Sequence, residues 1–221
     1  LFDVYRQQCT ADRNLFRLAL FLGFFPQVME GPICRYNQTA CQLWEAPPLR
    51  YANFMLGLQR MSYGLMKKII IADRLNPLVR NVFNNYTDFD GGVIALAAVC
   101  YTVQLYMDFS GSMDAVTGTA QILGVTMPEN FRQPFFSKTI SEFWKRWHIT
   151  LTSFLRECVY FPLGGSRRGT ARTYCNIFAI YLISGFWHGA GWTFIVWGLL
   201  HGLGQVIERF WGPGRDKLPR W

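Results

Sequence analysis

An uncharged stretch of thirty-five residues, 173–207, constrains this chain more than any other feature. It holds no Lys, Arg, Asp or Glu, and Gly185, His188, Gly189 and Gly191 gather near its centre. About twenty apolar residues cross a bilayer as a helix. The stretch therefore predicts either two shorter membrane segments broken at the glycines or one span with a re-entrant piece, because glycine permits a break or a close helix contact.

His188 is the first candidate functional residue. Broken helices at membrane depth line a cavity, and an ionisable group placed there is a functional candidate by default. The alternative is an imidazole that hydrogen-bonds a backbone carbonyl between packed helices. Position alone leaves both interpretations open.

Composition favours a membrane protein over a nucleic-acid-binding one. Only 16% of the residues are charged and 51% are hydrophobic, whereas soluble domains average about 25% charged residues. The net charge of +8 would also suit nucleic acid. However, the basic residues lie beside apolar runs, where they suit anionic headgroups and positive-inside anchoring. These residues are Lys67, Lys68, Arg74, Arg167, Arg168 and Arg172.

The cysteines indicate neither a metal site nor a redox motif. All six lack a CxxC partner and a Cys/His zinc spacing. The chain begins at Leu1 without a signal segment and stops at Trp221. We expect it to be the interior of a longer protein.

Three further apolar or amphipathic stretches precede residue 108. Residues 15–29 are too short for a full span and predict a tilted, re-entrant or interfacial segment. Residues 51–71 predict an amphipathic helix, and Pro77 is expected to interrupt its continuation. Residues 93–107 are strongly apolar and end at Asp108. Because a carboxylate at the bilayer centre costs about 2.5–3.5 kcal/mol, Asp108 is expected at an interface, in a wet cavity or paired with a cation.

Downstream, small residues in 116–125 suit tight helix packing. Residues 137–159 predict one amphipathic helix, capped by Ser137 or Thr139 and with Glu142 beside Lys145 and Arg146. On another side of that helix, Trp144, Trp147 and His148 would form an aromatic and imidazole stripe. An interfacial helix explains the tryptophans and basic residues, but it explains His148 less well. The basic turn 162–169 predicts a loop at the membrane surface.

The chemistry available is that of imidazole. The sequence lacks the serine-hydrolase, zinc-protease and dinucleotide motifs, and leaves His148, His188 and His201 near apolar sequence. A neutral imidazole can take up and return a proton near pH 7. Acyl transfer to a hydroxyl needs such a base and benefits from a chamber poor in water.

Several motifs, in order along nearly the whole chain, resemble the membrane-bound O-acyltransferase (MBOAT) family, in its bacterial branch concerned with alginate O-acetylation. The matching segments lie at 24–36, 108–114, 128–131, 142–151, 162–165 and 185–190. The most specific are Glu-Phe-Trp-Lys-Arg-Trp-His, Pro-Leu-Gly-Gly and Gly-Phe-Trp-His-Gly-Ala.

The resemblance implies an all-α membrane protein, a multi-helix ring around a tunnel with re-entrant and amphipathic interfacial helices. Residues 1–221 would be a partial MBOAT domain whose N- and C-terminal membrane helices are missing. It places His188 at the family's essential histidine and His148 at the second active-site position; His201 is expected to serve in packing. Asp108, Trp144, Arg146 and Trp187 lie within the matching motifs and are the predicted substrate-binding residues.

The expected function is transfer of an acyl group, acetyl in the first instance, from a thioester donor to a hydroxyl of an exported polysaccharide. The donor would be acetyl-CoA or an acyl carrier acting as co-substrate, with no bound cofactor. Expected partners are membrane lipid, a cell-surface glycan and an extracytoplasmic acetyltransferase or esterase-like protein, in a multi-pass protein of the bacterial plasma membrane.

Two alternatives remain open: D-alanyl transfer to teichoic acid, and a non-catalytic transport or scaffold subunit. The Pro-Leu-Gly-Gly turn at 162–165 favours acetylation, because the resemblance implies that the D-alanylating branch usually lacks it.

Overall fold

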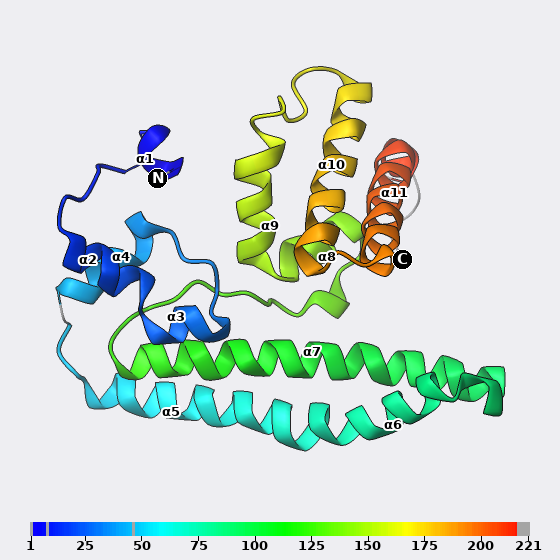
Figure 1. The fold of residues 1–221 in the computed structure, drawn as a ribbon, viewed down its shortest axis with the longest axis horizontal. Coiled ribbons are helices and arrows are strands. Elements are labelled where there is room, and N and C mark those ends of the chain that lie inside the picture. The colour runs from blue at the N-terminus through cyan, green and yellow to red at the C-terminus, as the bar shows by residue number, and fades with distance from the viewer. Residues whose placement is uncertain (1, 8, 46, 216–221) are drawn as a thin grey trace. The chain divides into compact units, whose positions relative to one another are not determined.

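The chain is all-helical in a computed structural model that describes residues 2–7, 9–45 and 47–215 (Figure 1). These residues form α-helices with short 3₁₀ and π segments and contain no strand, which confirms the predicted all-α class. The chain divides into two compact units, Leu1–Pro128 and Glu129–Trp221.

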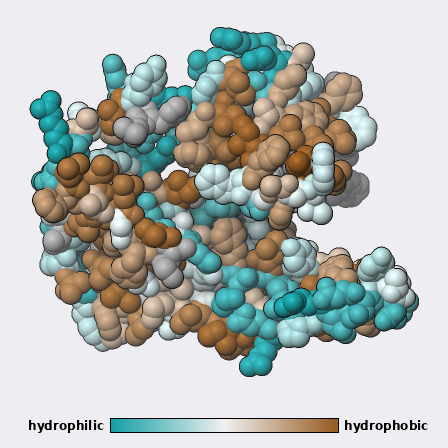
Figure 2. Space-filling model, viewed as in Figure 1, coloured by the Kyte–Doolittle hydropathy of each residue, from teal (hydrophilic) through white to brown (hydrophobic). Residues whose placement is uncertain are grey.

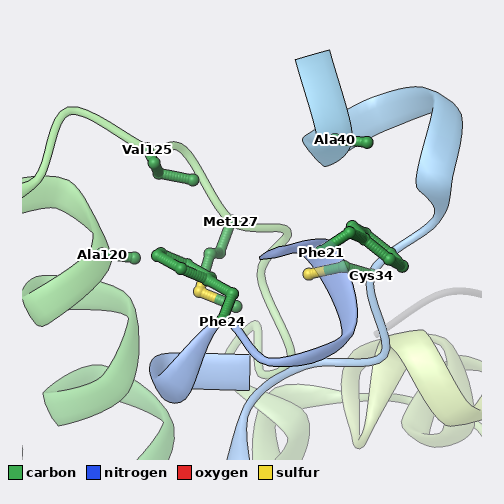
Figure 3. Close-up of a cluster of buried hydrophobic side chains, with 7 residues drawn as sticks. All are labelled: Phe21, Phe24, Cys34, Ala40, Ala120, Val125 and Met127. Atoms are coloured by element: carbon green, nitrogen blue, oxygen red, sulfur yellow. The ribbon is translucent and has the colours of Figure 1, made fainter. Parts of the chain in front are cut away.

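The first unit begins with four short helices. These are α1 (Phe2–Tyr5), α2 (Leu15–Leu22), α3 (Phe25–Glu30) and α4 (Tyr36–Trp44). The apolar segment predicted at 15–29 is therefore two helices, since Pro26 sits at the first turn of α3, where its missing N–H costs nothing. Their apolar faces meet the end of a later helix in the cluster drawn in Figure 3: Phe21, Phe24, Cys34, Ala40, Ala120, Val125 and Met127.

A long helical hairpin makes up the rest of the first unit. Its first arm runs through α5 (Tyr51–Met66), a π-helical segment η1 (Lys67–Ala72) and α6 (Asp73–Asn84); the return arm, after the 3₁₀ turn η2 (Tyr86–Asp88), is α7 (Gly91–Ile122). The expected interruption at Pro77 is wrong: the helix continues through it. The π segment ends at Ala72, directly before α6.

Glycines bring the two arms of this hairpin into backbone contact. A Cβ at Gly64 would lie 2.4 Å from the Gly111 carbonyl oxygen, and one at Gly57 would lie 2.6 Å from that of Gly118. On each helix the two contact glycines are seven residues apart, Gly57 and Gly64 on α5 and Gly111 and Gly118 on α7, which is the spacing of two helical turns. The prediction of tight packing by small residues around 116–125 is confirmed at Gly118.

Helix α7 also passes through Asp108 and Asp114 without a break. Within the described residues it is the one helix long and apolar enough to cross a membrane. Asp114 accepts hydrogen bonds from Lys67 Nζ at 2.6 Å and from Arg60 Nε at 3.0 Å. Asp108 lies 2.8 Å from Lys68 Nζ. Of the environments expected for Asp108, pairing with a cation is therefore the one observed.

The second unit carries both histidine motifs. It comprises η3 (Pro134–Phe136), α8 (Ile140–Arg146), α9 (Ile149–Leu155), the π segment η4 (Arg156–Tyr160), α10 (Thr170–His188) and α11 (Trp192–Arg215). The single helix predicted over 137–159 is wrong, because the chain breaks between α8 and α9 at Trp147 and His148.

The uncharged stretch folds as two helices separated at the glycines, so the predicted break is confirmed. That these helices cross a membrane remains a prediction, since α7 alone among the described helices meets the criteria for a span. Helices α10 and α11 pack side by side, joined through Gly189 and Gly191 (Figure 1). A Cβ at Gly185 would lie 2.5 Å from the Phe194 carbonyl oxygen, and one at Gly198 would lie 2.4 Å from that of Tyr181. Glycine thus supplies both the break and the close helix contact.

Apolar side chains reach the surface of both units, where hydrophobic residues are brown in Figure 2. On α7, Leu96 and Val99 are 62% and 61% exposed; on α10, Phe186 is 60% exposed. Surfaces of this kind are suited to contact lipid or further helices.

Candidate active site

His148 occupies the break between α8 and α9 in an unusual backbone conformation. Its φ and ψ of 45° and 54° are left-handed, a region that costs a residue other than glycine about 1–3 kcal/mol and persists only where surrounding contacts enforce it. This conformation ends one helix and starts the next, so the imidazole leaves the stripe that a continuous helix would have formed.

Asn130 supplies the contacts that hold this break. Its side-chain oxygen accepts the backbone N–H of Thr150 at 3.0 Å and the Thr150 hydroxyl at 3.0 Å, and lies 3.3 Å from His148 Nδ1. Its backbone carbonyl accepts the N–H of Ile149 at 3.0 Å. Since a backbone N–H must face an acceptor, the atom shared by these contacts is Oδ1 rather than Nδ2.

The same contacts define the tautomer of His148. Oδ1 is an acceptor only, so Nδ1 carries the proton, and the neutral ring presents its lone pair at Nε2. Burial, and to a smaller extent the charge on His188, lowers the pKa of His148 to about 4. His148 is therefore neutral at pH 7, with Nε2 as a hydrogen-bond acceptor.

His188 is the last residue of α10 and lies within electrostatic reach of His148. Its ring packs edge to face with Trp197 of α11 at a centroid distance of 5.2 Å, and is stacked beside Phe194 at 6.4 Å. The side chain is otherwise exposed. His148, at the α8–α9 break, and His188, at the end of α10, are forty residues apart in the chain, yet charge on His188 acts on His148.

His201 lies one turn further along α11 than Trp197 and packs among aromatic rings. Its ring centroid is 4.7 Å from that of Trp197, 5.0 Å from Trp144 and 6.2 Å from Tyr181. These contacts fit the packing role expected for it. The Trp144 indole N–H is buried there with no hydrogen-bond partner among the described residues. Trp144, a predicted substrate-binding residue, therefore lies in an aromatic cluster that reaches His188 through Trp197.

Trp147 stacks on Phe143 at 5.5 Å and meets Phe131 edge to face at 5.0 Å; Phe143 also meets Trp144 edge to face at 5.4 Å. The predicted helical stripe of Trp144, Trp147 and His148 is wrong, because α8 ends at Arg146 and His148 is left-handed.

Arg146, also predicted to bind substrate, forms an ion pair with Glu142 and donates a hydrogen bond to the Gln133 carbonyl. The expected helix cap is present, since Thr139 accepts the Glu142 N–H at 2.9 Å. The backbone N–H of Lys138 and the Arg146 guanidinium hold the pKa of Glu142 below its usual value. These contacts attach the Arg146 side chain to residues 133 and 142, near the start of the second unit.

The remaining predicted substrate residues are Asp108 and Trp187. Asp108 is in the first unit, where Lys68 Nζ pairs with it and with Asp73. Trp187 is 60% exposed beside His188.

Two asparagines that sequence reasoning did not single out prove central to the second unit. Besides Asn130, Asn176 is only 2% exposed and donates to the carbonyls of Gly165 at 2.9 Å and Leu163 at 3.3 Å. It thereby attaches the Pro-Leu-Gly-Gly turn to α10. The sequence offered one indication for each residue. Asn176 is a polar residue within the uncharged stretch 173–207, and Asn130 lies in the motif at 128–131.

Known proteins match the chain along its whole length. The family model for membrane-bound O-acyltransferases matches residues 8–219. A probable alginate O-acetylase of Pseudomonas putida is 42% identical over 227 residues, which cover 100% of this chain and 46% of the relative. A peptidoglycan O-acetyltransferase of Helicobacter pylori is 42% identical, covering 90% of this chain and 38% of the relative.

A teichoic acid D-alanyltransferase of Bacillus subtilis is more distant, at 29% identity over 94% of this chain and 56% of the relative. The chain thus spans less than half the length of the O-acetylating relatives. The match to the family model and the identity to these relatives extend over the α8–α9 break and the α10–α11 turn. The chain belongs to the membrane-bound O-acyltransferase family.

Proposed function

We propose that the protein containing this chain transfers an acyl group, acetyl in the first instance, from a thioester donor to a hydroxyl of an exported cell-surface polysaccharide. The observation that carries the proposal is a neutral His148, whose Nδ1 lies against Asn130 Oδ1, within electrostatic reach of His188. In a protein that served only as a membrane anchor, two ionisable imidazoles beside apolar helices would have no function.

In the proposed reaction His188 is the general base. It takes the proton of the acceptor hydroxyl as that oxygen attacks the thioester carbonyl carbon, and it returns the proton to the departing thiolate, so the C–S bond breaks as the C–O bond forms. A base of this kind typically contributes about 10²–10⁴ in rate.

We infer that His148 orients His188 or the acceptor hydroxyl rather than binding the acyl carbonyl of the donor. With the proton on Nδ1, its Nε2 can accept a hydrogen bond from His188 or from the acceptor hydroxyl, but it cannot donate one to an acyl carbonyl.

The membrane setting follows from family and composition. We propose a multi-pass protein of the bacterial plasma membrane, whose helices, together with segments outside this chain, form a ring around a tunnel. The thioester, acetyl-CoA or an acyl carrier, would enter from the cytoplasmic side and the glycan from the other. Such a chamber excludes the water that would hydrolyse the donor. An extracytoplasmic acetyltransferase or esterase-like partner would complete the system.

Acetyl transfer is favoured over D-alanyl transfer by similarity. The relatives named for O-acetylation are 42% identical to the chain, whereas the D-alanyltransferase is 29% identical. The Pro-Leu-Gly-Gly turn at 162–165, held to α10 by Asn176, is the motif that the resemblance associates with acetylation.

The test compares three histidine variants of the full-length protein. His188→Gln and His148→Gln should abolish or strongly reduce glycan acetylation while leaving membrane insertion intact. His201→Gln, the same change at the packing histidine, should retain acetylation. Normal acetylation by His188→Gln would remove that residue from the chemistry.

A second measurement separates an enzyme from a transport or scaffold subunit. Purified full-length protein should transfer labelled acetyl from the thioester to an acceptor, or to itself. Passage of acetyl groups that requires a separate catalytic partner would support the transport alternative.

A further inference from the structure

We propose that Asn130 is a positioning residue for the acyl transfer, fixing both the tautomer and the orientation of the His148 ring. The inference rests on the proposed function, because it assigns Asn130 a task in the reaction attributed to His148 and His188. Asn130 does not touch the reacting atoms in this account and acts only through His148.

Burial makes the Asn130 side chain a fixed reference point. Its residue is 2% exposed, and its Oδ1 accepts two hydrogen bonds from Thr150 in addition to its contact with His148 Nδ1. Since Thr150 is also buried, neither the amide nor its anchor can rotate without leaving a polar group unsatisfied.

The strained backbone of His148 needs contacts to hold it, and the contact of its Nδ1 with Asn130 is one of them. The left-handed φ of 45° at this residue costs energy, and these contacts, that with Asn130 Oδ1 among them, hold it at the break between α8 and α9. Side chains that orient an imidazole by accepting its second N–H fix the tautomer and ring direction, and their loss typically costs about 10–100-fold in the function of that histidine at metal sites. Asn130 stands in the same relation to His148.

A purely structural role is the competing explanation, because Asn130 also secures the start of α9 through Ile149 and Thr150. Thr150→Val separates the two roles. It removes the hydroxyl that Oδ1 accepts and leaves both the Thr150 backbone N–H and the His148 contact in place.

The experiment measures kcat, donor KM and thermal stability of full-length Asn130→Leu, Asn130→Asp and Thr150→Val. Asn130→Leu removes the acceptor and should lower kcat about 10–100-fold with donor KM within about twofold. Asn130→Asp keeps an acceptor oxygen and should recover most of that loss. Thr150→Val should lower stability but keep kcat within about threefold, since His148 stays oriented.

Two outcomes would overturn the inference: a kcat for Asn130→Leu that falls no further than that of Thr150→Val at matched stability, or an Asn130→Asp enzyme as impaired as Asn130→Leu. Should Asn130→Leu not accumulate, Asn130→Ser, whose oxygen is one bond closer to the backbone, serves in the same comparison.

The histidine variants keep this test distinct from that of the proposed function. Full activity in both His148→Gln and His188→Gln rejects the chemistry itself. Inactive histidine variants together with an unchanged Asn130→Leu reject only the role of Asn130.

Discussion

At the scale of single residues, the His148 ring is neutral at pH 7 in the folded protein. Its folded pKa of about 4 lies below the ordinary value of 6.5. The unfolded chain therefore takes up a proton first as the pH falls. The stability linked to His148 is fully present above pH 6.5 and is lost as the pH falls towards 4.

We expect His148→Gln to flatten the loss of thermal stability between pH 6.5 and pH 4 relative to the unsubstituted protein. The linked free energy of unfolding should be about 1–3 kcal/mol, because one unit of pKa corresponds to about 1.4 kcal/mol and the ring is partly exposed. Melting curves of the full-length protein in detergent across this pH range measure it. Parallel curves for the two proteins would contradict the prediction.

Lys67 and Lys68 are neighbours with very different surroundings. Lys67 is 7% exposed, pairs with Asp114 and lies over the Tyr63 ring, whereas the Lys68 side chain is 41% exposed. Lys67→Met should lower the free energy of unfolding towards the lower end of about 3–5 kcal/mol, since Arg60 still neutralises Asp114. Lys68→Met, the matched control, should cost about 1 kcal/mol or less. Thermal unfolding in detergent compares them, and equal losses would refute the difference.

Residue identities were only partly predictable from the sequence. His148, His188 and the cation pairing of Asp108 could be anticipated, because imidazole and carboxylate beside apolar runs demand a special environment. Asn130 could not, since its importance depends on contacts with Thr150 and His148, eighteen to twenty positions away. Short-range pattern carries no information about such a contact.

At the scale of helices, the α5–α7 pair depends on glycine at the contact. Gly64→Ala would place a methyl group 2.4 Å from the Gly111 carbonyl oxygen and 2.6 Å from the Ala115 nitrogen, both backbone atoms that cannot rotate away. We expect a loss of about 1–3 kcal/mol in the free energy of unfolding. Gly91→Ala, at the open start of α7, meets nothing within 4 Å and should be neutral or slightly stabilising. Unfolding of both variants in detergent checks this, and an undiminished Gly64→Ala would contradict it.

Helix existence followed from the sequence better than helix ends did. The α10–α11 break was predictable because glycines interrupt a long uncharged run. The α8–α9 break was not, because Trp147 and His148 are ordinary helix residues and the break comes from Asn130 and Thr150. Pro77 misled in the opposite direction, since α6 continues through it.

At the scale of the whole molecule, exposed apolar side chains on α7, α10 and α11 call for lipid or for further helices. Family membership and composition were accessible from the sequence. The ring and the tunnel stay predictions drawn from the resemblance, because they depend on how separate helical segments assemble.

We expect residues 1–221, expressed alone in bacteria, to sediment with membranes and resist extraction by alkaline carbonate, because α7 is long and apolar enough to span. Immunoblotting of the membrane and soluble fractions measures this. A variant carrying Leu96→Lys and Val99→Lys on the exposed face of α7 should be extracted more readily. Recovery of the unsubstituted chain in the soluble fraction would contradict the expectation.

The glycine contacts between α5 and α7 also limit which length changes this region can tolerate. Each added residue rotates a helix by about 100°, so one insertion between Gly57 and Gly64 would swing one glycine away and present a bulky neighbour to the opposing backbone. Because the two glycines would then be eight residues apart on α5 but still seven apart on α7, no compensating slide of α7 could restore both contacts. Natural variants of this segment should therefore differ by substitution between these glycines and keep their insertions for the loop around 85–90.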